Sequence, residues 1–246
     1  MRSRAAIFGL VLILSIGLLT GIVFTVDPAL DLRFAALFYD PARHGFLSAE
    51  SPFISEFRQL NTWLVVAVSV VAVASLLVRL LRPHRPSLLP ARTVIFLLVT
   101  LALGPGLLVN GVLKEHWARP RPGAVMQFGG TEAFMPWWDP RGTCGGNCSF
   151  VSGEVSSAFW MLAPAAVVPP PWRGLAMTGA IAFGVMVGLL RAAVGGHFLT
   201  DIIFAGVFTS LIIWVVHGLM FRWPRGFFSR FGEPSLSAGR EPKSAE

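Results

Sequence analysis

Six apolar runs, each near the length needed to cross a lipid bilayer, restrict the fold of this chain more than any other feature. About 20 apolar residues of helix span the hydrocarbon core of a bilayer. The runs comprise residues 5–26, 63–81, 93–113, 151–169, 175–190 and 199–221. The membrane interior offers no water to the backbone, so such runs fold as helices that pair their own N–H and C=O groups. The sequence therefore predicts an all-α polytopic membrane protein, with about six transmembrane helices forming a bundle.

Arginines gather at alternate ends of these runs and predict the orientation of the chain. They are Arg2, Arg4, Arg79, Arg82, Arg85, Arg92, Arg173, Arg222, Arg225 and Arg230. Basic residues favour the cytoplasmic side, so both termini are expected there, with segments 27–61, 115–150 and 192–198 outside. Most of the net charge of +7 belongs to these topology signals and to the polar clusters described below, and no basic patch remains for nucleic acid.

The apolar runs also predict the domain organisation. The first run resembles a signal peptide but is longer and lacks a small-residue cleavage pattern, so an uncleaved signal anchor is expected. We expect one transmembrane domain over residues 1–231, with its core at roughly 60–221, and a disordered cytoplasmic tail at 232–246. Apolar residues at helical spacing within 27–61 predict a helix lying on the membrane surface, with a plain connecting loop as the alternative.

The outer segment 115–150 is the longest irregular stretch and is rich in proline and glycine, which is typical of a functional loop. It contains the two cysteines of the chain, Cys144 and Cys148. The Gly-Gly-Asn between them can turn tightly, so an oxidising compartment would allow a disulfide here. A pair of free thiols is the alternative, and two cysteines without a nearby histidine make a poor zinc site.

Three polar clusters lie where apolar runs begin or end, on or beside the predicted outer face. The first consists of Lys114 and Arg121, followed by Pro122. A lysine at the end of a membrane helix often only anchors the helix at the interface. The Arg-Pro-Arg-Pro sequence at 119–122 indicates a binding role, because proline fixes the backbone and a planar guanidinium fits phosphate oxygens.

The second cluster, Ser152-Gly153-Glu154, opens the fourth run. The first turn of a helix presents unpaired N–H groups to an anion, and glycine permits its close approach. Ser152 could instead serve only as a helix N-cap. Glu154 can stabilise a first helical turn, but among several cations at membrane depth it is also a candidate acid.

The third cluster consists of Arg191, His197 and Asp201. His197 and Asp201 are four residues apart at the start of the sixth run, so they share a helix face and the carboxylate can hold one ring nitrogen. Such an oriented histidine beside an arginine is a candidate nucleophile. Together the clusters indicate phosphoryl transfer without a metal, because no clustered carboxylates suit magnesium and no Walker-type loop is present.

These motifs resemble those of the type 2 phosphatidic acid phosphatase family, which is related to the vanadium haloperoxidases. The family pattern of Lys, six residues and Arg-Pro matches Lys114, Arg121 and Pro122. Its pattern of Ser-Arg, five residues, His, three residues and Asp matches Arg191, His197 and Asp201, with leucine at position 190 in place of serine. The resemblance covers roughly residues 60–221. The haloperoxidase branch is soluble, which this chain is not.

The middle motif departs from the family, because Glu154 stands where Pro-Ser-Gly-His has its histidine. In the family that histidine is taken as the general acid. We expect Glu154 to take its role, with His116 as the alternative acid. The resemblance implies that His197 attacks phosphorus with support from Asp201, forming a phosphohistidine without any cofactor. The non-bridging oxygens would be held by Lys114, Arg121, Ser152, Gly153 and Arg191.

The outward-facing site and the resemblance imply a lipid phosphate in the outer leaflet of a bacterial inner membrane as substrate. The form Ser-Phe-Val-Ser-Gly-Glu at 149–154, preceded by cysteine, resembles lipid A 4′-phosphatase-type members of the family. Undecaprenyl pyrophosphate phosphatase is the alternative. A different class also stays open, since Glu154 could mark a non-hydrolytic lipid-phosphate-binding protein or a phosphotransferase. The sequence leaves the oligomeric state undetermined.

Overall fold

The computed structural model describes residues 2–47, 51–84 and 86–223, so the predicted tail lies outside the described residues. Within this part, five helices are long and apolar enough to cross a membrane, namely Arg4–Val26, Pro52–Leu81, Ala91–His116, Arg173–Ala193 and Leu199–Arg222. They correspond to α1 (Arg2–Val26), α3 (Pro52–Leu81), α4 (Ala91–Leu101) with its extensions, α8 (Arg173–Ala193), and α9 (Leu199–His217) continued by η4 (Gly218–Arg222). The predicted all-α membrane fold is confirmed.

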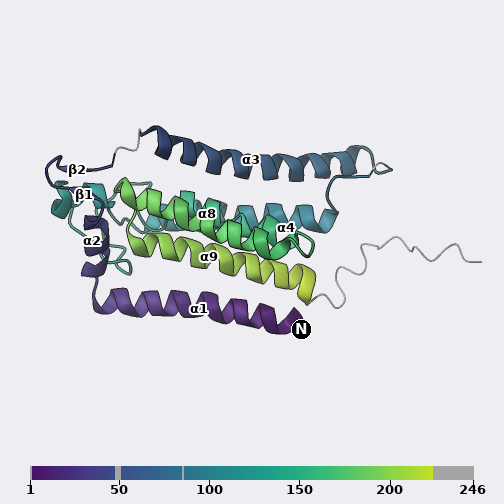
Figure 1. Ribbon diagram of the computed structural model, residues 1–246, viewed down its shortest axis with the longest axis horizontal. Helices are drawn as coiled ribbons and strands as arrows, with labels where there is room; N and C mark the ends of the chain where they lie inside the picture. The colour runs from purple at the N-terminus through teal and green to yellow at the C-terminus, as the bar shows by residue number, and fades with distance from the viewer. Residues whose placement is uncertain (1, 48–50, 85, 224–246) are drawn as a thin grey trace, which may run out of the picture.

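The long helices lie side by side, with α1 and α3 on opposite sides and α8 and α9 between them (Figure 1). The short helix α2 (Ala29–Ala36) and the strands β1 (Tyr39–Asp40) and β2 (Gly45–Phe46) lie across one end of the bundle. The strands pair as an antiparallel hairpin. The start of α1 and the end of α9 lie at the opposite end, which is the arrangement expected if both face one side of the membrane.

The fourth apolar run does not form a helix long enough to span. It folds as α6 (Gly153–Phe159) and α7 (Leu162–Val167), joined by a tight turn at Trp160 and Met161. Proline at 164 explains the break, because its ring crowds the carbonyl four residues earlier, at Trp160. The buried Trp160 indole donates a 3.0 Å hydrogen bond to Thr100 Oγ1 and fixes the turn against α4. The sequence predicted about six spans, and the described residues form five long helices together with this broken segment.

The helix predicted within segment 27–61 is shorter in the structure than expected. Only α2 is helical before the hairpin, and α3 begins at Pro52, well before the apolar run that starts at residue 63. The first turns of α3 carry polar side chains, including Arg58 and Asn61, that contact other elements rather than lipid. Hydropathy alone therefore placed the start of this helix too late.

The third spanning helix delivers the first polar cluster to the end of the bundle. It runs from α4 through η1 (Ala102–Leu113) to α5 (Lys114–His116). Pro105 within η1 cannot donate a backbone hydrogen bond, and the helix there widens into π-helical turns. Beyond α5, the long loop contains only the short helices η2 (Pro122–Ala124) and η3 (Met126–Phe128).

Candidate active site

The structure brings the three predicted clusters together at the end of the bundle covered by α2. Lys114 begins α5, Ser152 precedes α6, Arg191 lies in the last turn of α8, and Asp201 lies in the first turn of α9. The Ser152 N–H donates to the Asp201 carbonyl at 3.4 Å. A methyl group on residue 153 would lie 3.5 Å from Lys114 Nζ and only 2.8 Å from the amide oxygen of Asn110, so any larger residue there would require the Asn110 side chain to move.

His197 is held as a neutral ring, and its Nε2 makes no hydrogen bond among the described residues. The side chain is 2% exposed, and Nδ1 lies 2.8 Å from the carbonyl oxygen of Ser149. A carbonyl oxygen only accepts, so Nδ1 carries the proton and Nε2 keeps its lone pair. Burial lowers the pKa of His197 well below its usual value, and the charges of Arg191, Arg121 and Lys114 lower it further. The ring therefore suits nucleophilic attack through Nε2.

Asp201 supports His197 indirectly rather than through the predicted contact with the ring. Its Oδ2 lies 3.9 Å from His197 Nδ1, which is too far for a hydrogen bond. The same oxygen accepts from Ser149 Oγ at 2.6 Å and from the Phe198 N–H at 2.8 Å. Asp201 thus fixes Ser149, whose carbonyl fixes the ring. The i, i+4 spacing indicated proximity correctly, but the helix start turns the carboxylate onto its own backbone.

A buried ion network, missed by the sequence analysis, holds Asp201 in turn. Arg119 is fully buried and donates to Asp201 Oδ1 at 2.5 Å and to Asp31 Oδ2 at 2.7 Å. It also donates to Thr200 Oγ1 at 2.8 Å and to the Met135 carbonyl at 2.9 Å. Asp31 lies on α2, so one guanidinium joins α2, the long loop and α9. Within Arg-Pro-Arg-Pro, the sequence could not show which arginine turns inward.

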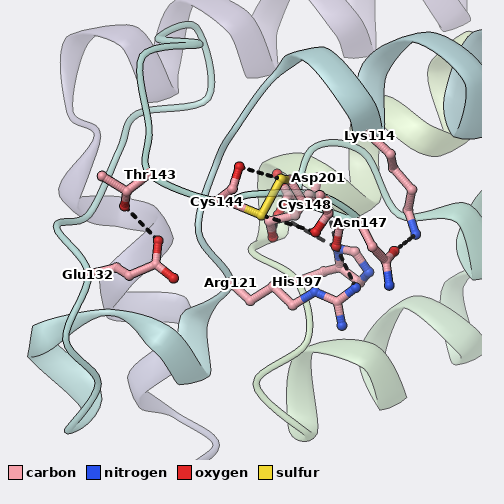
Figure 2. Close-up of a disulfide and its surroundings, with 11 residues drawn as sticks. Lys114, Arg121, Glu132, Thr143, Cys144, Asn147, Cys148, His197 and Asp201 are labelled. Carbon is pink, nitrogen blue, oxygen red and sulfur yellow. Dashed lines mark hydrogen bonds and ion pairs between the residues drawn. A yellow bond between two sulfur atoms is a disulfide. The ribbon is translucent and has the colours of Figure 1, made fainter.

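Lys114 and Arg121 share a partner that the sequence analysis also missed. Lys114 Nζ donates to the side-chain oxygen of Asn147 at 2.7 Å, and Arg121 Nη2 donates to the Asn147 backbone carbonyl at 2.8 Å. Figure 2 shows Arg121 beside His197 and Lys114 pointing at Asn147. Asn147 belongs to a loop in which Cys144 and Cys148 form a disulfide. The two cations therefore share one residue as partner, and both charges act on His197.

Ser152 caps the first turn of α6, and Glu154 pairs with arginine side chains. Ser152 is fully buried, and its hydroxyl accepts from the Val155 N–H at 3.4 Å as an N-cap. The Glu154 carboxylate accepts from Arg58 at 3.0 and 3.2 Å and lies 3.7 Å from Arg191 Nε. Arg58 comes from α3, 96 residues earlier in the chain, and sequence spacing gave no sign of it.

His116, the alternative acid, turns back along its own helix. Its Nδ1 lies 2.8 Å from the carbonyl oxygen of Val112, and the residue is exposed. Among residues 2–47, 51–84 and 86–223, no three His, Cys, Asp or Glu side chains converge as metal ligands. The positive charges around His197 are those of Lys114, Arg121 and Arg191.

The lowered pKa of His197 predicts that its ring takes up a proton only at a pH below the usual range of histidine. We expect the ring to remain neutral when the pH falls through about 6.5, the value of an unperturbed histidine. The unfolded chain takes up a proton there that the folded chain refuses, so the protein loses stability as the pH falls below that value. Nitrogen NMR of histidine-labelled protein in micelles, with His197→Asn to assign the signal, measures this. A ring that titrates at the ordinary pKa would contradict the described environment.

Comparison with known proteins places this site in a family. Residues 93–225 match the PAP2 superfamily. A lipid A 4′-phosphatase of Francisella tularensis subsp. novicida (strain U112) is 34% identical over 216 residues, covering 87% of this chain and 97% of the relative. Lipid A 4′-phosphatases of Rhizobium leguminosarum and Rhizobium etli are 34% and 33% identical, each over 78% of this chain and over 87% and 79% of the relative. No solved structure matches the chain. The chain belongs to the PAP2 superfamily and is a membrane phosphatase.

Proposed function

We propose that this membrane lipid phosphatase removes the 4′-phosphate of lipid A at the outer face of a bacterial inner membrane, with His197 as nucleophile. The observation that carries the mechanism is the neutral, buried His197, whose Nε2 is free among Lys114, Arg121 and Arg191. The names of the relatives support the substrate. The disulfide between Cys144 and Cys148 supports the outer face, because such bonds persist in oxidising compartments.

The reaction proceeds in two displacements. His197 Nε2 attacks phosphorus while the bond from phosphorus to the sugar oxygen breaks, which gives a phosphohistidine and the free sugar hydroxyl. Water then attacks the phosphohistidine, releases inorganic phosphate and restores the ring. Lys114, Arg121 and Arg191 neutralise charge on the non-bridging oxygens, and the Gly153 N–H at the start of α6 adds a donor. Ser152 shapes this helix start as its N-cap.

Glu154 is the proposed acid, and its surroundings suggest how it is protonated. In the resting site its carboxylate is paired with Arg58 and lies near Arg191. A phosphate dianion bound in the site would compete with Glu154 for Arg191. The Glu154 side chain is 32% exposed, so a proton can reach it from solvent. It then protonates the leaving sugar oxygen and accepts a proton from the attacking water in the second step.

This assignment predicts a leaving-group effect. Glu154→Gln keeps the size of the side chain but cannot transfer a proton, so turnover of a lipid phosphate should fall by about 10²–10⁴-fold. An aryl phosphate, whose leaving group needs no proton, should lose far less. Phosphate release from both substrates by the purified variant measures the ratio. Equal losses on both substrates would remove Glu154 from the acid role.

Substrate identity is tested with a panel of lipids in detergent. Lipid A, undecaprenyl pyrophosphate, phosphatidic acid and phosphatidylglycerol phosphate each give a different product by mass spectrometry. The proposal predicts loss of the 4′-phosphate of lipid A, with the other lipids turned over more slowly. Preferred cleavage of undecaprenyl pyrophosphate would make that lipid, and not lipid A, the substrate. Absence of phosphate release from every lipid would overturn the proposal in favour of a lipid-phosphate-binding protein.

A further inference from the structure

The disulfide-closed loop at 144–148 contacts Lys114 and Arg121, the two cations proposed to bind phosphate. The side-chain oxygen of Asn147 accepts from Lys114 at 2.7 Å and its backbone oxygen accepts from Arg121 at 2.8 Å. One residue therefore contacts both cations of the first motif with two oxygens, as a phosphate group would (Figure 2). This geometry also offsets the repulsion between two like charges that face the same site.

The loop is attached to the backbone segment that carries both cations. The Cys148 N–H donates to the Lys114 carbonyl at 3.3 Å, and the Cys144 N–H donates to the Ala118 carbonyl at 3.2 Å. Between the cysteines lie two glycines, which leave the chain many backbone conformations. Asn147 itself has a φ of 48°, in the left-handed region that asparagine tolerates better than most residues. The disulfide between Cys144 and Cys148 restricts this otherwise flexible turn.

We propose that Asn147 is a positioning residue for Lys114 and Arg121, and that the Cys144–Cys148 disulfide holds it in place. Asn147 keeps both cations aimed at the phosphate position in the empty site and yields them to the incoming phosphate. The disulfide thereby sets phosphate affinity, although neither cysteine touches the substrate. This inference rests on the proposed function for the role of the two cations, but its test uses phosphate binding rather than lipid turnover.

The test measures equilibrium binding of inorganic phosphate and orthovanadate to the purified full chain in detergent. Asn147→Gly permits the same left-handed backbone conformation and removes the side-chain contact with Lys114, and Cys144→Ser/Cys148→Ser opens the loop. Each should weaken binding of both anions by about tenfold or more, because small misplacements of charged ligands are costly. With an aryl phosphate as substrate, KM should rise by a similar factor while kcat changes less. The melting temperature in detergent is recorded for every variant.

Thr143→Ala is the matched control. Thr143 lies next to the disulfide-closed loop, and its Oγ1 donates to Glu132 at 2.7 Å rather than to a partner of Lys114 or Arg121, so its loss should leave anion binding unchanged. Dithiothreitol supplies two electrons to convert the disulfide to two thiols, and it should weaken binding by the native protein but not by the double serine variant. The inference fails if Asn147→Gly binds both anions as the native protein does, or if Thr143→Ala weakens binding equally. It also fails if the native protein binds neither anion, and failure of lipid turnover alone leaves it standing.

Discussion

His197→Ala is expected to lower phosphate release from lipid A by about 10⁴-fold or more, since losing a nucleophile leaves only the contribution of binding and charge. The side chain is 2% exposed, and its Nε2 makes no hydrogen bond within the described part of the chain. Removal of the buried ring also removes its hydrogen bond with the Ser149 carbonyl, so folding of the variant must be checked. Phosphate release is measured with purified protein in detergent, with the melting temperature recorded alongside.

His116→Ala is the control for this prediction. The His116 ring bonds the carbonyl of Val112 on its own helix, so its removal should leave most of the activity. A folded His197→Ala protein that still turns over lipid A at a rate near that of the native chain would contradict the nucleophile assignment. If His116→Ala instead lost activity selectively on poor leaving groups, the acid role would move from Glu154 to His116.

Among the single substitutions proposed here, Arg119→Met is expected to lower the free energy of unfolding the most. Removing this guanidinium leaves the buried carboxylates of Asp31 and Asp201 without their shared cation. Breaking a buried ion pair from one side costs about 3–5 kcal/mol in the free energy of unfolding. Activity should fall too, because Asp201 fixes Ser149 and Ser149 fixes the His197 ring. Thermal unfolding and phosphate release in detergent measure the two effects.

Two further variants isolate the cause. Adding Asp31→Asn to Arg119→Met removes one of the stranded charges, so the double variant should recover part of the lost stability. Arg33 lies on the same short helix α2 and pairs with Asp27, which precedes that helix. The Arg33 side chain is 63% exposed, so Arg33→Met should change the melting temperature little. An Arg119→Met protein as stable as the native chain would show that the network does not hold α2, the loop and α9 together.

The sequence predicted the helices well because a bilayer leaves the backbone few alternatives. It failed where polar residues or proline interrupt an apolar run. The first turns of α3 carry Arg58 and Asn61, which lowered the local hydropathy although the helix continues through them. The proline at 164 divides the fourth run within the bundle, although its composition resembles that of a spanning helix.

The candidate site was predicted through residues that stand at fixed spacing, such as Lys114 with Arg121 and His197 with Asp201. The residues that position them could not be found in this way. Arg58 lies 96 residues before Glu154, and Asp31 lies 88 residues before Arg119. Ser149 and Asn147 act partly through backbone carbonyls, which every residue possesses, so the sequence carries no signal for these contacts.

The stereochemical course at phosphorus tests the central claim most directly. A substrate whose transferred phosphorus is made chiral with oxygen isotopes and sulfur is hydrolysed by the native protein, and the configuration of the released thiophosphate is determined. Each in-line displacement inverts phosphorus, so attack by His197 followed by attack by water predicts overall retention. Overall inversion would mean that water attacks the lipid phosphate directly, and it would contradict a covalent intermediate on His197.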